Sequence, residues 1–257
     1  MAKNTQIQKV TAADLELAAK ESAGEVASIG GSAYFSTKSG VLAFDGAPVP
    51  DNQMAVVVLN HTFMNVYYKE DYDPDNTTPP DCYAFGSDLK TMGPGDDVEE
   101  KQNDTCQGCP MNEWGSGKGR GKACGNKVRV QLISAGNLEN GRFKQFTDAD
   151  HFTSAPVGLL NVPVTSVTGF AAYVKQLANS LSRPTWAVFT KVRVVPDAKS
   201  QFKVTFEPIT QVPNELLGVL KARVTDAKSE AKTFAFVAKE DAPAPAAKGK
   251  RGAKKKY

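Results

Sequence analysis

The stretch Thr105-Cys106-Gln-Gly-Cys109-Pro110 decides how this chain is to be interpreted. The chain has only two other cysteines, Cys82 and Cys124, and the full spacing is C-x23-C-x2-C-x14-C. A two-residue gap lets both sulfurs face one point, and a glycine inside the gap with a proline after it favours a tight turn. Four thiolates form a ligand set typical of structural zinc. We therefore predict that Cys82, Cys106, Cys109 and Cys124 bind one Zn²⁺ ion.

Other uses of these four cysteines remain open. Two disulfides would need an oxidising compartment, but the first residues, Met-Ala-Lys-Asn-Thr-Gln, contain no apolar signal region. A thioredoxin-type pair normally lies at a helix start after a strand, whereas this pair lies in a polar, glycine-rich segment. An iron–sulfur cluster also accepts four thiolates, and His61 or His151 could replace the distant Cys82 as a ligand. Zinc fits the spacing and the expected compartment best.

The composition is that of a soluble globular protein. The chain has 257 residues, of which 41% are hydrophobic and 23% are charged. No apolar run approaches the roughly 18 residues of a membrane-spanning helix, so no membrane partner is expected. With no targeting segment at its start, the chain is expected to be cytoplasmic.

Charge is distributed unevenly along the chain. Residues 69–104 carry eleven acidic residues and three lysines, whereas residues 105–129 carry one acidic and five basic residues. Residues 242–257 contain six basic residues and no acidic one. An acidic arm thus leads into a basic cysteine region, and such asymmetry indicates binding to a polyanion. We predict one domain over 1–241 that includes a zinc-binding insertion at 81–126, followed by a disordered basic tail over 242–257.

The hydrophobic pattern outside the cysteine region is typical of strands with a few helices. Strands are expected over 32–44, 53–68, 127–134, 157–167, 185–195 and 201–209, and helices over 11–23, 169–181 and 214–232. This series predicts an α+β protein that is mainly β. The leading interpretation is an OB-like five-stranded barrel with a zinc-stapled insertion, because the exposed face and loops of such barrels bind oligonucleotides.

Cations and aromatic residues near the cysteines and on the strands indicate a nucleic-acid surface. Binders of single strands combine a basic groove with aromatic platforms on which bases stack. The candidate contacts are Trp114, Lys118, Arg120, Lys122, Lys127, Arg129, Tyr67, Tyr68, Lys191 and Arg193. The alternative for each aromatic residue is burial in the barrel core, and for the lysines of the cysteine region it is a solvated loop.

No catalytic group is expected. The glycine-rich stretch after Trp114 does not match a phosphate-binding loop, because Gly121-Lys122 is one residue too far from Gly115 and Ala123 replaces the Ser or Thr. The acidic cluster at 70–81 lacks the order and the glycine of an EF-hand. A metal-dependent enzyme would need an open coordination position, which four thiolates would close. We therefore predict that the protein is not an enzyme.

Part of the cysteine region resembles a known module. The segments Pro80-Asp-Cys82, Asp104–Pro110, Asn112-Glu-Trp-Gly-Ser116 and Gly121-Lys-Ala-Cys124 look like a cysteine module of phage-encoded proteins. The general plan resembles the zinc-containing single-stranded-DNA-binding proteins of tailed phages, in which a zinc subdomain is inserted in an OB-fold. The motifs cover about a fifth of the chain, and the rest agrees only as coarse architecture.

The resemblance implies a protein that coats single-stranded DNA, or RNA, without catalysis. Its implied setting is phage DNA replication and recombination in the host cytoplasm, with replication or transcription proteins as further partners. A second hypothesis is a zinc-stapled protein-interaction or transcription-regulating module that docks on a host or phage polymerase. The acidic arm over 69–104 favours that second hypothesis.

Overall fold

The computed structural model describes residues 33–71 and 78–236, together with Thr11, Leu15, Ala18 and Ser22. The helix predicted over 11–23 lies largely outside the described residues, and the basic tail predicted over 242–257 lies entirely outside them. Within the described residues, the protein is α+β and consists mostly of sheet, as the sequence predicts.

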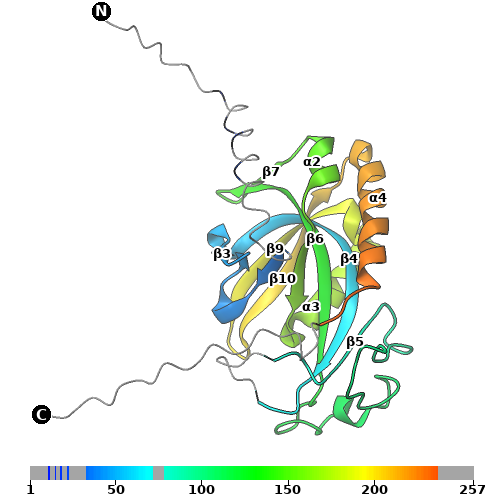
Figure 1. Cartoon of the computed structure of the whole chain (residues 1–257). Coiled ribbons are helices and arrows are strands. Elements are labelled where there is room, and N and C mark those ends of the chain that lie inside the picture. The colour runs from blue at the N-terminus through cyan, green and yellow to red at the C-terminus, as the bar shows by residue number, and fades with distance from the viewer. Residues whose placement is uncertain are drawn as a thin grey trace, which may run out of the picture.

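One ten-stranded sheet forms the centre of the protein (Figure 1). Its strands are β1 (Tyr34–Ser36), β2 (Ala43–Phe44), β3 (Ala47–Pro48), β4 (Gln53–Tyr67), β5 (Cys82–Gly86), β6 (Gly125–Glu139), β7 (Arg142–Gln145), β8 (Gly158–Val162), β9 (Val188–Asp197) and β10 (Gln201–Gln211). The hydrogen-bonded order is β10-β9-β4-β6-β8-β1-β2-β3, with β5 beside β4 and β7 beside β6. All pairs are antiparallel except β1 and β8, which run parallel.

Strands β4 and β6 form the spine of this sheet. Each is fifteen residues long, and they pair from Ala55 opposite Gly136 to Val66 opposite Gly125. The apolar run 54–59 of β4 is continuous rather than alternating, which is typical of a strand buried on both faces. The other edge of β4 pairs with β9 near its start and with β5 near its end. One strand therefore joins two parts of the molecule that have different partners.

Helices cover both faces of the spine. Helix α3 (Val164–Gln176) and its π-helical extension η4 (Leu177–Leu181) pack on one face, whereas α2 (Ala149–Ser154) and α4 (Asn214–Ala231) pack on the other. Leu132 belongs to the core with α3 and the next residue, Ile133, belongs to the core with α4, as the alternation of a strand requires. Figure 1 shows α4 running alongside the sheet next to β4. In the described part of the chain, no helix has the length and apolar character needed to cross a bilayer.

Several predicted elements are confirmed with shifted bounds. The hairpin of β9 and β10 and the helix α4 lie where the sequence places them. Helix α3 begins at Val164 instead of residue 169, because Pro163 supplies a φ of −58° that leads directly into the first turn. The hairpin of β6 and β7 was not predicted. Its signal is Asn140-Gly141, whose φ values of 50° and 74° suit a two-residue turn.

The predicted OB-like five-stranded barrel is not confirmed, because the sheet is open. Closing the set β10-β9-β4-β6-β8 would need β8 to pair with β10. Instead β1 pairs in parallel with β8, with Tyr34 opposite Leu159, and takes that edge. The 3-10 turn η1 (Lys38–Gly40) after β1 reaches back towards β10, where a Cβ on Gly40 would lie 3.7 Å from the Phe202 ring. The N-terminal strands thus fill the gap at which a barrel would close.

The ends of the main strand order are short or interrupted. Strand β3 has two residues, one of which is Pro48. Strand β10 is longer, but its register shifts between Pro208 and Thr210. The β3 end therefore presents no long row of unpaired backbone groups, whereas β10 keeps a regular register with β9 over residues 201–208.

The predicted insertion at 81–126 lies between β4 and β6, which pair directly with each other. We call residues 82–124 the cysteine lobe. It contains β5 and the 3-10 turn η3 (Pro110–Asn112) and little other regular structure. Small clusters of buried side chains attach it to the sheet, among them Met64 and Val66 of β4 with Tyr83 and Val98 of the lobe. The lobe is therefore an ordered extension at the end of β4 that lies away from β9.

The packing of α4 on the sheet predicts a specific cost for loss of its central side chain. Leu220 is fully buried in the core with α2. We expect Leu220→Ala to lower the free energy of unfolding by about 2–5 kcal/mol, since it removes buried methyl groups and leaves a cavity. Urea denaturation followed by circular dichroism measures this loss. Lys221→Ala, an exposed neighbour on the same helix, is the control and should change the stability by less than about 0.5 kcal/mol.

Candidate metal centre and nucleic-acid surface

The strands position the first and last cysteines. Cys82 is the first residue of β5 and lies opposite Tyr67 of β4. Cys124 directly precedes Gly125, the first residue of β6, which pairs with Val66 of β4. The two cysteines farthest apart in this part of the sequence therefore lie on either side of the end of one strand.

The middle cysteines belong to a tight turn. Gly108 has a φ of 78°, a conformation that other residues rarely adopt, and η3 follows directly after Cys109. The Asn112 side chain donates a hydrogen bond to the carbonyl of Cys106 at 2.9 Å, and its backbone N–H donates to the carbonyl of Cys109 at 2.8 Å. These bonds fix the C-x2-C turn in the form expected from its spacing.

Backbone hydrogen bonds connect this turn to the rest of the lobe. The Cys124 N–H donates to Met111 O at 2.8 Å, and the Cys106 N–H donates to Met92 O at 2.8 Å. All four thiols are free, and all four cysteines line one small cavity of about 20 Å³. A space of this size holds about one water-sized species. The structure thus brings the four predicted ligands together around a single small space.

Burial and neighbouring thiols raise the pKa values of three of these cysteines. Burial raises the pKa of the Cys82 and Cys106 thiols and raises that of Cys124 to about 12, and the neighbouring cysteines add to each of these shifts. Four thiolates in one buried space repel one another, and a bound divalent cation would remove that repulsion. Four sulfur donors suit zinc or an iron–sulfur cluster.

The four thiols are not arranged as a closed coordination shell. In the described part of the chain, no group of three or more His, Cys, Asp or Glu side chains is already arranged to hold a metal ion. The common cavity and the mutual pKa shifts nevertheless put the four sulfurs within electrostatic reach. The four-cysteine ligand set therefore stays a prediction.

Neither histidine lies at this cavity. The His61 ring packs against Phe170 of α3 at 5.5 Å, and Nε2 of His151 lies 3.0 Å from the Ser134 carbonyl oxygen. The alternative in which a histidine replaces Cys82 therefore has no support in the arrangement of the side chains.

A buried amide next to the thiols, Asn65, and its half-buried partner Asn126 were not found from the sequence. Asn65 is only 3% exposed, and its side chain hydrogen-bonds the Cys106 thiol. Its Oδ1 also accepts a hydrogen bond of 2.7 Å from the Asn126 side chain on β6. A buried amide within an otherwise apolar strand could have signalled this role, because such a group needs partners.

The cations and the tryptophan of the cysteine lobe lie on one loop. Trp114 is 81% exposed, and the Lys122 ammonium lies 5.5 Å from its ring centroid. Arg120 is exposed, and Lys118 forms an ion pair with Asp71. The loop is ordered by its own hydrogen bonds, since the N–H groups of residues 115 and 117 both donate to the carbonyl of residue 121 at 3.0 Å. The structure therefore gathers these four predicted contacts.

A hollow of about 310 Å³ lies beside this loop. Lys90 and Lys122 line it together with the side chains of Asn65, Asn112 and Asn126. Among the residues that the structure describes, no carboxylate lines this hollow, so its charged lining is the two lysines. Such a recess suits a phosphate group.

The remaining candidates near the lobe differ in exposure. Tyr68 is 44% exposed and Tyr67 is half-buried at the end of β4. Lys127 is half-buried, and burial lowers the pKa of its ammonium. Of these three, Tyr68 is the most accessible.

Arg129 is placed differently from what a surface contact requires. It is 4% exposed, and its guanidinium lies 4.7 Å from the Phe85 ring and 4.9 Å from the Phe234 ring. Its Nε donates a 3.0 Å hydrogen bond to Asn161 of β8. The aromatic rings that cover it come from β5 and from the residues after α4. As the chain is arranged here, Arg129 is a structural side chain.

Lys191 and Arg193 lie on a separate part of the molecule. They are on β9, where Lys191 forms an ion pair of 2.7 Å with Glu207 and Arg193 lies between Gln53 and Thr205 on the neighbouring strands. Strand β9 pairs with the start of β4, whereas the cysteine lobe adjoins its end, about 35 Å along an extended strand. The predicted contacts therefore form two patches.

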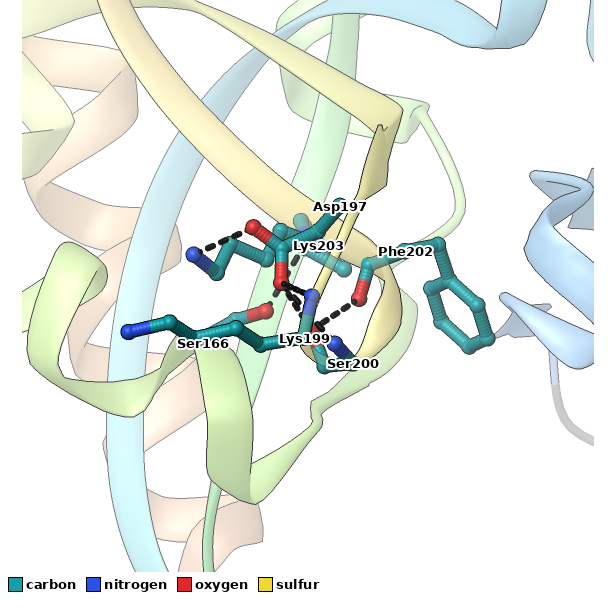
Figure 2. A network of polar contacts seen from close by, with 7 residues as sticks. Ser166, Asp197, Lys199, Ser200, Phe202 and Lys203 are labelled. Atoms are coloured by element: carbon teal, nitrogen blue, oxygen red, sulfur yellow. Dashed lines mark hydrogen bonds and ion pairs between the residues drawn. The ribbon is translucent and has the colours of Figure 1, made fainter.

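The turn beside the second patch is firmly ordered. Figure 2 shows Asp197 at the centre of a polar network with Lys199, Ser200 and Lys203. The Lys203 ammonium, 2.6 Å away, and then the Ser200 hydroxyl hold the pKa of Asp197 well below its usual range. The Val204 N–H donates to Ser166 of α3 at 2.9 Å, which connects this turn to the helix. The network fixes the β9–β10 turn, and Lys199 takes part in it through its backbone N–H.

No protein-family model, curated protein or solved structure matches this chain.

The geometry of the thiols predicts the effect of removing two of them. We expect the double variant Cys106→Ser/Cys109→Ser to lose bound metal, because two of four ligands are removed, and to expose the cysteine lobe to proteases. Elemental analysis of protein purified under reducing conditions and limited proteolysis measure both effects.

Gln107→Ala is the matched control, since it changes an exposed residue inside the same turn and keeps all four thiols. Unchanged metal content in the double variant, or equal loss in Gln107→Ala, would contradict the assignment.

Proposed function

We propose that the protein binds single-stranded nucleic acid, principally DNA, without catalysis, and that a zinc ion held by the four cysteines shapes its binding lobe. The observation that carries this proposal is Trp114. A tryptophan that is 81% exposed, beside an ammonium group and two further cations, is an unusual use of a large apolar side chain. Stacking on a nucleobase while the cations contact phosphates accounts for both features.

The connectivity of the sheet supports an OB-like comparison. Strands β4, β6 and β8 are followed by α3 and then by β9 and β10, and β4 pairs with both β6 and β9. We infer an OB-like barrel opened between its third and fifth strands. In this comparison the cysteine lobe is the loop between strands 1 and 2, and the turn at Asp197 lies between strands 4 and 5. Those two loops are the ones that bind oligonucleotides in OB-folds.

Zinc has a structural role in this proposal. The lobe has few regular elements and only small clusters of buried side chains, so a metal ion would add much of the free energy that orders it. The ordered lobe then presents Trp114 and its neighbouring cations together. Four thiolates leave no open position for a catalytic water.

The biological setting we propose is phage DNA replication and recombination, on the resemblance of the cysteine motifs. A second candidate is a docking module for a host or phage polymerase. Exposed carboxylates on the lobe favour it, among them Asp88, Asp96, Glu99 and Asp104. An acidic surface repels nucleic acid and attracts basic protein partners.

Binding to oligo(dT) tests the role of the tryptophan loop. We expect Trp114→Ala to weaken binding by about 1–3 kcal/mol, the contribution of a stacked base. We expect the triple variant Lys118→Gln/Arg120→Gln/Lys122→Gln to make the dependence of log K on log salt shallower by about 2, since about 0.7 is lost per phosphate contact. Fluorescence anisotropy at several salt concentrations measures both.

Matched controls lie elsewhere on the surface. Tyr34→Ala removes another exposed aromatic ring, and Arg142→Gln/Lys144→Gln/Lys175→Gln removes three exposed cations. These variants should bind like the wild type. Absence of oligo(dT) binding by the wild-type protein at low salt would reject the proposal, and recovery of a polymerase from nuclease-treated lysate would then favour the docking module.

The charge of the C-terminal residues gives a separate prediction. Residues 242–257 carry six basic side chains and no acidic one. We expect their deletion to weaken oligo(dT) binding moderately and to reduce the salt dependence, because fewer phosphates are neutralised. The same anisotropy titration measures this. An unchanged affinity and salt dependence would assign the tail to another role.

A further inference from the structure

A second cavity lies on the outer side of the sheet, apart from the thiols. It is open to solvent, has a volume of about 610 Å³, and lies between β5, residues 93–97 and the end of α4. A space of several hundred cubic ångströms is sufficient for a small organic ligand. Its lining is mixed, with aromatic, neutral polar and cationic side chains.

One wall of this cavity is aromatic. Phe85 of β5 and Phe234, three residues after α4, both line it, and their ring centroids are 5.6 Å apart. The buried Arg129 guanidinium contacts both rings, which fixes their positions. Preorganised rings of this kind favour a flat, unsaturated group.

Another wall is cationic. Lys228 and Lys232 line the cavity and are four residues apart, so they lie on the same side of the end of α4. Neither forms an ion pair with a carboxylate in the described part of the chain. Two ammonium groups at one side of a recess favour an anion such as a phosphate.

The remaining lining can form neutral and acceptor contacts. Asn60, His61 and Thr62 of β4 line the cavity, and burial and then Lys228 lower the pKa of His61, which keeps its ring neutral. Asp97 also lines it and accepts a hydrogen bond from the Tyr83 hydroxyl. The Asp97 carboxylate offers acceptors for amino or hydroxyl groups of a ligand.

We propose that this cavity binds a nucleotide, with its base against the aromatic wall and its phosphate towards Lys228 and Lys232. A flat ring, an anion and donor groups in one molecule match the three parts of the lining. The source of the nucleotide, a phosphorylated end of a bound strand, rests on the proposed function. The nucleotide chemistry itself stands on the cavity alone.

Calorimetric titration of the full-length protein with AMP tests the site, with adenosine and inorganic phosphate as partial ligands. We expect AMP to bind and each partial ligand to bind at least about tenfold more weakly, since each lacks one of the two recognised groups. Lys228→Gln/Lys232→Gln should weaken AMP binding by about tenfold or more, because charge-assisted contacts are lost. Lys175→Gln/Lys221→Gln, two exposed lysines elsewhere on α3 and α4, is the matched control and should bind AMP like the wild type.

Lack of AMP binding by the wild type, or equal binding by the Lys228/Lys232 variant, would overturn the nucleotide site. The source is tested by competition between AMP and oligo(dT) with or without a 5′- or 3′-phosphate. Displacement of AMP only by a phosphorylated oligonucleotide supports the strand end. Displacement independent of the phosphate overturns that source. Binding of AMP without any binding of oligo(dT) would reject the proposed function and leave the nucleotide site standing.

Discussion

The long antiparallel pairing of β4 with β6 is the constraint on which the rest of the structure depends. The pair separates the two hydrophobic cores, one with α3 and one with α2 and α4. Its end also sets the position of Cys82 and Cys124, since each flanks the last residues of β4. Register is strongly specified in such a pair, because a slip of one residue would exchange the two buried faces. The sheet therefore determines where the first and last cysteines of the lobe lie.

The backbone of the cysteine lobe is ordered, although it brings together buried thiols that would repel one another when deprotonated. Its turn at Gly108 and its hydrogen bonds to Met92 and Met111 hold the part of the backbone that follows β5. The same compactness buries the sulfurs close to one another, and their pKa values rise in consequence. Deprotonation is easier when a cation binds, so metal binding by these residues would release protons and grow stronger as the pH rises. Protein stability and metal occupancy would then be linked at this end of the molecule.

The sequence was informative where local pattern decides structure. The apolar run of β4, the hairpin of β9 and β10 and the helix α4 follow from periodicity and turn residues. That the sheet stays open could not be predicted from local pattern. It depends on β1 pairing with the edge of β8, more than a hundred residues away in the sequence. The parallel pairing of β1 with β8 has no signature in the sequence near either strand.

The candidate site shows the same division. The spacing of the four cysteines was sufficient to predict that they meet, and they do line one cavity. Alternation along β6 placed Arg129 on a face shared with Lys127, but it gave no indication that Phe234 would cover the guanidinium from a position 105 residues later. Likewise, Phe189 and Lys191 lie on the same face of β9 by alternation, yet Phe189 is fully buried in the core with α4. Burial by distant segments is a tertiary effect that periodicity does not record.

The β3 end of the strand order has a consequence for concentrated protein. Strand β3 has two residues, one of them Pro48, and is a poor template for a strand from another molecule. Intermolecular extension of the sheet, a step towards fibrous aggregates, is thereby disfavoured at the β3 end of the order. Copies crowded together would therefore not join their sheets through β3.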